Sequence, residues 1–170
     1  MTLLPMSGRA RVLGDDVNTD YIISSRRKKE SIDPAVLRSY LLEDVDTTFA
    51  ASVHPGDILV AGKNFGCGSA MEVAVTVVMG AGIRAVIAKS FSRTYLRNAI
   101  NNGLLPVVAD TSDVQEGDFI SLRVDADARL ILHSANGTSL LCDPIAPFML
   151  DMLELGGLVP YLRRYDGFVA

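Results

Sequence analysis

The sequence predicts an α/β fold with a mostly parallel central sheet and an antiparallel ribbon toward its C-terminal end. Short apolar segments rich in β-branched residues alternate with helix-like segments up to about residue 103, which is typical of βαβ units. Two later segments alternate apolar and polar residues and predict the ribbon. Ligands of parallel sheets bind beyond the carboxyl ends of the strands, so the loops there are where a site is expected.

The first strand is expected over residues 9–13, and a polar, turn-prone loop follows over residues 14–20. Asp33 and Pro34 are residue types favoured at a helix N-cap and at the first helical position. We expect the helix that they begin to cover about residues 35–42.

The second strand is expected over residues 57–61, where β-branched residues form a short apolar run. A glycine-rich turn over residues 64–72 separates this strand from an apolar helix, expected over about residues 70–79. Glycines at positions 80 and 82 are the predicted end of that helix.

A third buried strand is expected over residues 85–88. The next helix should cover about residues 92–101, with Gly103 as its C-terminal glycine. The elements expected later in the chain are ribbon strands over residues 119–124 and 129–133 with a turn at 125–127, a helix over about 144–155, and an apolar tail over 158–170.

Composition limits the class of protein. A chain of 170 residues with 49% apolar residues can fill one core, so we expect one domain over residues 1–170. A net charge of −4 argues against a nucleic-acid binder. No apolar run reaches about 18 residues, and the start of the chain lacks a signal-peptide pattern. We therefore expect no membrane segment and a cytoplasmic location.

Cysteines and histidines are too few and too scattered in the sequence for a metal site. Cys67, Cys142, His54 and His133 show no metal-ligand spacing such as Cys-x-x-Cys. We therefore expect no metal bound by this chain alone. Cys67 is interpreted as a small residue in a tight turn, because no histidine lies close in sequence to activate its thiol.

The glycine-rich turn is a candidate anion site. Gly66 and Gly68 can adopt positive φ and let a ligand approach the backbone, while the N–H groups at a helix N-terminus favour negative charge. Ser69 has two interpretations here. Its spacing from Glu72 is that of a capping box, which would make it a helix cap, whereas its place beside the expected ligand would make it a functional serine.

Five segments of the chain, taken in order, carry a resemblance to a known family. They cover residues 14–20, 56–69, 81–93, 97–103 and 155–158. Together they resemble the small subunits of 3-isopropylmalate dehydratase and the equivalent mobile domain of aconitase. The resemblance extends over nearly the whole chain, and the ordered set is more specific than any one segment.

The resemblance implies a swivelling β/β/α domain that docks on a separate large subunit carrying a 4Fe-4S cluster. It implies a hydro-lyase of leucine biosynthesis that is active only with that subunit. The enzyme would interconvert 2- and 3-hydroxy acids through an unsaturated intermediate. On this resemblance Ser69 is the catalytic base, Gly68 lies at the substrate and Arg93 binds a substrate carboxylate. Arg97 and Lys63 are second choices for a carboxylate binder.

The sequence departs from the family pattern in two places. Met71 stands where the family has an arginine at the substrate, which removes a guanidinium able to hold a carboxylate through two hydrogen bonds. The segment at the family's substrate-recognition loop, residues 24–30, is strongly cationic. Arg26, Arg27 and Lys28 are therefore either a solvated surface or a site that admits a polyanionic substrate.

These departures leave three functions open. The chain is expected to be the small subunit of a dehydratase acting on 3-isopropylmalate, or of a related enzyme acting on a dimethylmalate, methylmalate or homoaconitate type of acid. The third alternative is a non-catalytic anion-binding module that retains the fold. The apolar tail and the incomplete site suggest an interface with the large subunit or, in the isolated chain, with a second copy, although a buried core would give the tail the same composition.

Overall fold

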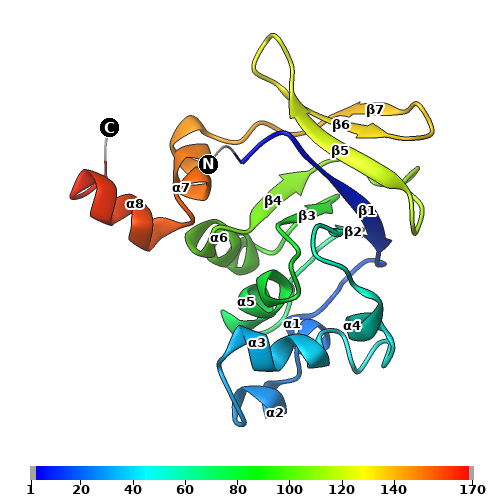
Figure 1. The fold of residues 1–170 in the computed structure, drawn as a ribbon, viewed down its shortest axis with the longest axis vertical. Helices are drawn as coiled ribbons and strands as arrows, with labels where there is room; N and C mark the ends of the chain where they lie inside the picture. Colours follow the sequence, from blue (N-terminus) through cyan, green and yellow to red (C-terminus); the bar gives the residue numbers. More distant parts are fainter. Residues whose placement is uncertain (1–2, 169–170) are drawn as a thin grey trace.

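The computed structural model describes residues 3–168 and contains a seven-stranded sheet in the order β4-β3-β2-β1-β5-β6-β7. The strands from β1 to β4 pair in parallel, and the strands from β1 through β5 to β7 pair antiparallel (Figure 1). This confirms the predicted fold class, with the ribbon continuing the sheet beyond β1. The strands are β1 Met6–Val12, β2 Ile58–Ala61, β3 Ala85–Ala88, β4 Leu105–Val108, β5 Phe119–Val124, β6 Leu130–Ser134 and β7 Ser139–Leu141.

The two central parallel strands, β2 and β3, are buried at every position, as expected of strands covered on both faces. Leu59 and Val86 face one apolar cluster, while Val60 and Ile87 face a second cluster on the other side of the sheet. Neither β4 nor β7 was predicted from the sequence. Pro106 lies within β4, where it is tolerated because β4 is an edge strand.

Helices cover both faces of the parallel half of the sheet. The cluster that contains Leu59 includes residues of α1, α3, α4 and α5, and the cluster that contains Val60 includes residues of α7 and α8. Within residues 3–168, no helix is long and apolar enough to span a membrane. The helices are α1 Thr19–Ile22, α2 Ser25–Lys28, α3 Pro34–Leu37, the 3₁₀ turn η1 Arg38–Tyr40, α4 Phe49–Ser52, α5 Val73–Gly80, α6 Arg93–Asn102, α7 Pro147–Glu154 and α8 Leu158–Tyr165.

Helix ends follow the predicted signals where those signals are local. The side chain of Asp33 accepts a hydrogen bond from the Ala35 N–H and caps α3. The side chain of Ser92 caps α6, and Gly103 ends α6 in the left-handed conformation. The predicted cap at Asp33 and the predicted end at Gly103 are confirmed, and the helix expected from about residue 92 begins at Arg93.

Two predicted segments differ in the structure. The helix expected over residues 35–42 ends as α3 at Leu37 and continues as a 3₁₀ turn, because Leu42 takes a left-handed conformation and its N–H donates to the Ile22 carbonyl. The segment expected as an apolar tail forms α8 up to Tyr165, with Tyr161 buried against the core. Residues 169–170 of that tail lie outside the described residues.

An aromatic cluster joins α6 to the loop that follows β2. The ring of Phe65 lies edge-on to those of Tyr95 and Phe91, with centroid distances of 5.1 Å and 5.9 Å, a favourable aromatic geometry. The buried Tyr95 hydroxyl donates a hydrogen bond of 3.2 Å to the Ala74 carbonyl and so links α6 to α5. Gly66 packs its Cα directly on the Tyr95 ring, leaving no space for a Cβ.

The contact between Gly66 and Tyr95 generates a prediction with a matched control. Gly66 and Gly137 both have positive φ, but a Cβ on Gly137 would meet no neighbouring atom within 4 Å. Gly137→Ala should cost about 1 kcal/mol of unfolding free energy through backbone strain. Gly66→Ala should cost about 1–3 kcal/mol more, because the new methyl overpacks the Tyr95 ring. Urea unfolding of the two variants measures the difference, and equal losses would contradict the packing argument.

Candidate functional site

Three loops meet at the carboxyl edge of the parallel strands. They follow β1, β2 and β3 and cover residues 13–18, 62–72 and 89–92. Neighbouring parallel strands end at the same edge, so these loops lie side by side and share backbone hydrogen bonds. The shared bonds include Gly62 N–H to Gly14 at 3.1 Å, Gly66 N–H to Val17 at 2.8 Å, Phe65 N–H to Ser90 at 3.0 Å, and Lys89 N–H to Gly62 at 3.0 Å.

Ser69 lies on the glycine-rich turn of the middle loop and is exposed. Within residues 3–168, its hydroxyl has no hydrogen-bond partner. The capping-box interpretation is wrong, because α5 begins at Val73 and the residue at its N-cap, Glu72, makes no side-chain cap bond. The hydroxyl of Ser69 is therefore free to meet a ligand or a partner protein.

The reason for the later helix start is tertiary. Met71 is only 5% exposed and packs in the core cluster under α5, and the Ser69 carbonyl accepts a hydrogen bond from Thr19. Both contacts keep the backbone between Gly68 and Glu72 from joining the helix, which therefore begins at Val73. The expectation that the turn lies directly at a helix N-terminus is thus wrong, since Ser69 lies four positions before the first residue of α5.

Asn18 and Thr19, at the start of α1, pack against the turn and hold its backbone in place. The Thr19 N–H donates to the Cys67 carbonyl at 2.8 Å, and the Thr19 hydroxyl donates to the Ser69 carbonyl at 2.8 Å. Gly68, with φ of +92°, lies against the Asn18 side chain with no room for a Cβ. Sequence reasoning placed the 14–20 segment near the site only by resemblance and missed these contacts, because the residues involved are far apart in the chain.

Ser92 links the turn to the start of α6. Its hydroxyl donates a hydrogen bond of 2.9 Å to the Gly66 carbonyl and accepts one from the Tyr95 N–H. Arg93, the next residue, is exposed and has no ion-pair partner among residues 3–168. The predicted carboxylate binder Arg93 therefore follows a residue that contacts the turn directly.

The second-choice cations have different surroundings. Arg97 borders a hollow formed with Phe148 and Phe168, on the side of α6 toward α7 and α8. Lys63 is exposed in the loop after β2, where its N–H donates to the Asp15 carboxylate. Lys63 lies on the same loop as Ser69, whereas Arg93 is joined to the turn through the hydrogen bond of Ser92 to the Gly66 carbonyl.

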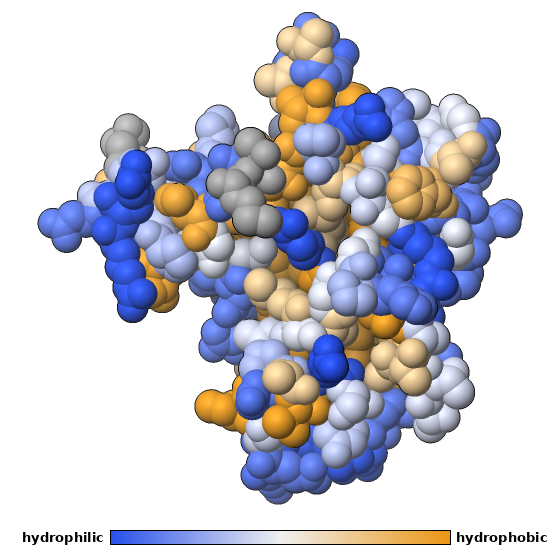
Figure 2. All heavy atoms as spheres, in the orientation of Figure 1, coloured by the Kyte–Doolittle hydropathy of each residue, from blue (hydrophilic) through white to orange (hydrophobic). Residues whose placement is uncertain are grey.

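The basic segment forms α2, and two of its charges are paired. Arg26 lies 2.8 Å from the Asp44 carboxylate, and Arg27 forms two hydrogen bonds with Glu43 while its guanidinium stacks 3.8 Å above the Tyr40 ring. The hydrogen bond from Arg27 is the main reason that the pKa of Glu43 is lowered. Figure 2 shows hydrophilic side chains along the lowest edge of the molecule, where α2 lies, with hydrophobic ones directly above them.

Lys28 differs from these arginines. It is exposed and, in the part of the chain that the structure describes, it makes no ion pair. The predicted cationic site thus divides into Arg26 and Arg27, which anchor α2 to the loop around residue 43, and Lys28, whose charge remains available.

Metal-ligating side chains do not converge in residues 3–168, where no three of His, Cys, Asp or Glu group together. Cys67 lies in the turn, whereas Cys142 is buried, and its burial raises the pKa of its thiol to about 11. This donor set does not fit an iron–sulfur cluster, which thiolates ordinarily hold.

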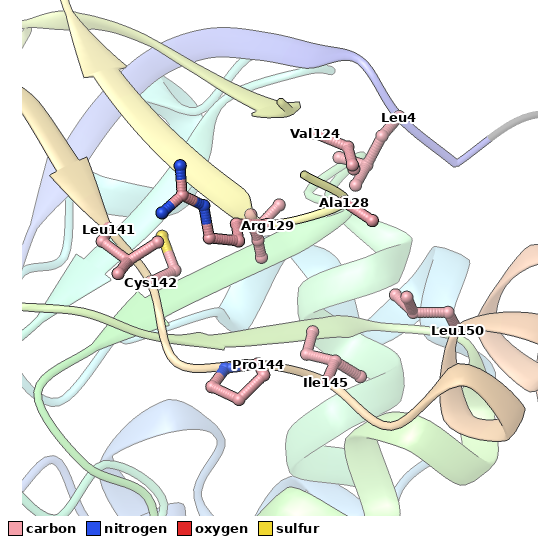
Figure 3. A pocket seen from close by; sticks show the side chains of 10 residues that line it. Leu4, Val124, Ala128, Arg129, Leu141, Cys142, Pro144, Ile145 and Leu150 are labelled. Carbon is pink, nitrogen blue, oxygen red and sulfur yellow. The ribbon is translucent and has the colours of Figure 1, made fainter. Parts of the chain in front are cut away.

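An apolar cavity of about 280 Å³ lies apart from the loops, between the ribbon and the start of α7 (Figure 3). The side chains of Leu4, Val124, Ile145 and Leu150 line it. The guanidinium of Arg129, also in its wall, pairs with aspartates of the ribbon turn. No acid–base pair belongs to its lining, so the candidate site remains the carboxyl edge.

Comparison with known proteins gives a family match. The family model of the aconitase C-terminal domain matches residues 22–112. The methanogen homoaconitase small subunit of Methanocaldococcus jannaschii is 41% identical over 94% of this chain and 92% of its own length. The 3-isopropylmalate dehydratase small subunit 2 of Archaeoglobus fulgidus is 41% identical over 95% of this chain and 97% of its own.

A solved structure supports the same assignment. The crystal structure of 3-isopropylmalate dehydratase from Methanocaldococcus jannaschii superposes with a TM-score of 0.88 at 40% identity and covers 96% of each chain. The resemblance found in the sequence motifs is thereby confirmed. The chain belongs to the aconitase C-terminal domain family, within the group formed by 3-isopropylmalate dehydratase small subunits and their homoaconitase relatives.

Proposed function

We propose that this chain is the small subunit of an iron–sulfur-dependent hydro-lyase of the 3-isopropylmalate dehydratase type. The reaction would interconvert 2- and 3-hydroxy acids through an unsaturated intermediate. The observation that carries the proposal is the free, exposed hydroxyl of Ser69 on a turn fixed by both neighbouring loops. The names of the relatives support the same reaction class.

In the proposed mechanism, Ser69 removes a proton from the carbon next to a substrate carboxylate. A serine can act as a base only where nearby N–H groups and positive charge stabilise its alkoxide. Gly68 leaves the backbone of the turn accessible, and Arg93 supplies a guanidinium that can bind a carboxylate through two parallel hydrogen bonds. Arg93 would therefore orient the substrate while Ser69 moves the proton.

We assign the 4Fe-4S cluster to a separate large subunit. This assignment rests on two observations: the donor side chains of residues 3–168 do not converge, and the relatives are named small subunits. A small subunit that presents a base and a cation on an exposed edge has the form expected of one half of a shared active site.

A second substrate class is favoured by one observation. Lys28 is an exposed cation without an ion pair among the described residues, and a homoaconitase-type acid carries one more carboxylate than 3-isopropylmalate. The relative named methanogen homoaconitase small subunit is as similar in identity as the dehydratase relatives. Lys28 would bind the additional carboxylate as a point charge.

The role of Ser69 is tested in the complex with a cluster-bearing large subunit. Ser69→Ala should lower kcat by about 10²–10⁴-fold, the range for loss of a positioned acid or base. Its unfolding midpoint should be unchanged, because the hydroxyl has no partner within residues 3–168. Ser7→Ala, at another exposed serine on β1, is the control and should retain full turnover. Near wild-type turnover of Ser69→Ala would remove the base assignment.

The role of Arg93 is tested by a substitution that keeps the charge. Arg93→Lys loses the bidentate geometry, so KM should rise about tenfold or more, since hydrogen bonds to charged groups contribute about 1.5–3 kcal/mol. Arg97→Lys, one helical turn further along α6, should change KM less than twofold. Steady-state kinetics of the complex decide between them, and an equal response would contradict the assignment.

The substrate is tested by a panel of acids with wild-type protein and Lys28→Ala. If Lys28 binds a third carboxylate, the substitution should raise KM for a homoaconitate-type acid about tenfold and leave KM for 3-isopropylmalate unchanged. A clear wild-type preference for 3-isopropylmalate would remove the second substrate class. If the complete complex dehydrates none of the acids, the hydro-lyase proposal falls and the anion-binding module becomes the better account.

A further inference from the structure

We infer that Thr19 is a positioning residue for Ser69, an inference that rests on the proposed role of Ser69 as a base. Thr19 is the first residue of α1 and is 2% exposed. It contacts the turn at two points, through its N–H to the Cys67 carbonyl and through its hydroxyl to the Ser69 carbonyl, each at 2.8 Å. The two bonds lie on either side of Gly68.

The turn needs such a restraint because of its own composition. Gly66 and Gly68 both have positive φ, and glycine leaves the backbone more conformations to lose than any other residue. Without an external contact, the carbonyl of Ser69 would rotate freely over the exposed edge. A base must lie within about 3–3.5 Å of the atom it attacks, and a 1 Å displacement can cost a hundredfold in rate.

Thr19 is suited to hold the turn because its own position is fixed. The Asn18 side chain caps α1 by accepting the Asp20 N–H, and the next turn of the chain buries Ile22 and Ile23 in the core. The hydroxyl of Thr19 therefore projects from a rigid support. Its contact is with the main chain of Ser69, so it leaves the Ser69 hydroxyl free, and Thr19 acts through Ser69 without touching the substrate.

The chain offers a matched control in Thr111. Thr111 is 7% exposed, and its hydroxyl donates a hydrogen bond of 2.7 Å to the Ala61 carbonyl at the end of β2. Thr19→Val and Thr111→Val thus remove the same kind of group from the same kind of contact. They differ in that only Thr19 holds the residue proposed as the base.

The first test uses the complex with the large subunit. Thr19→Val should lower kcat about tenfold with KM changed less than twofold, while Thr111→Val should leave kcat within twofold of wild type. Thr19→Ser, which keeps the hydroxyl, should restore most of the turnover. If Thr19→Val gives too little folded protein, Thr19→Cys, whose thiol is a weaker donor, should give an intermediate kcat. Equal kcat for the Thr19 and Thr111 variants would overturn the inference.

The second test separates this inference from the proposed function. Backbone ¹⁵N relaxation of the small subunit reports the mobility of Gly68, Ser69 and Ala70 without any turnover. Thr19→Val should lower the order parameters of these amides, and Thr111→Val should not. A wild-type complex without activity would remove the proposed function alone, whereas unchanged order parameters in Thr19→Val would overturn the positioning role.

Discussion

The parallel pairing of β1, β2 and β3 is the constraint on which the site depends. It brings the loops after all three strands to one edge, where each donates or accepts backbone hydrogen bonds with the next. The apolar pattern alone does not set this register, because β2 and β3 are buried on both faces and a one-residue slip would exchange apolar residues for apolar residues. The backbone hydrogen bonds from Gly66 to Val17 and from Phe65 to Ser90 favour one register of the strands over the alternatives. The site and the register therefore stabilise each other.

The same edge combines a fixed backbone with unengaged side chains. Thr19 and Ser92 hold the carbonyls of the turn, whereas Ser69 and Arg93 are exposed and their side chains make no hydrogen bond or ion pair within residues 3–168. Met71 contributes differently from the arginine expected at its position. Its side chain fills the core under α5 and carries no charge. In the proposed mechanism, substrate carboxylates would therefore be bound by cations outside the turn.

The sequence predicted those parts of the fold whose signals are local. The apolar runs of β2 and β3, the ribbon, the cap at Asp33 and the helix end at Gly103 each depend on residues adjacent in the chain. The edge strand β4 was missed because it is short and contains Pro106, and α8 because two glycines precede it. The capping-box interpretation of Ser69 could not be rejected from the sequence, because the hydrogen bond to its carbonyl comes from Thr19, fifty positions away. The roles of Ser69 and Arg93 stay predictions, and the contacts that support the turn could not be predicted because they join residues far apart in the chain.

The basic segment shows the same limit for electrostatics. Its run of charges suggests a strong positive field, but the acidic loop that follows η1 neutralises Arg26 and Arg27. Because the pKa of Glu43 is lowered below its ordinary value, mainly by the hydrogen bond from Arg27, the carboxylate is charged at neutral pH. The pairing contributes stability above the ordinary glutamate pKa and is lost as pH falls through the lowered value. At neutral pH these arginines therefore fix α2 in place, and the role proposed for a cation of this segment at a third carboxylate falls to Lys28, whose charge is unpaired among residues 3–168.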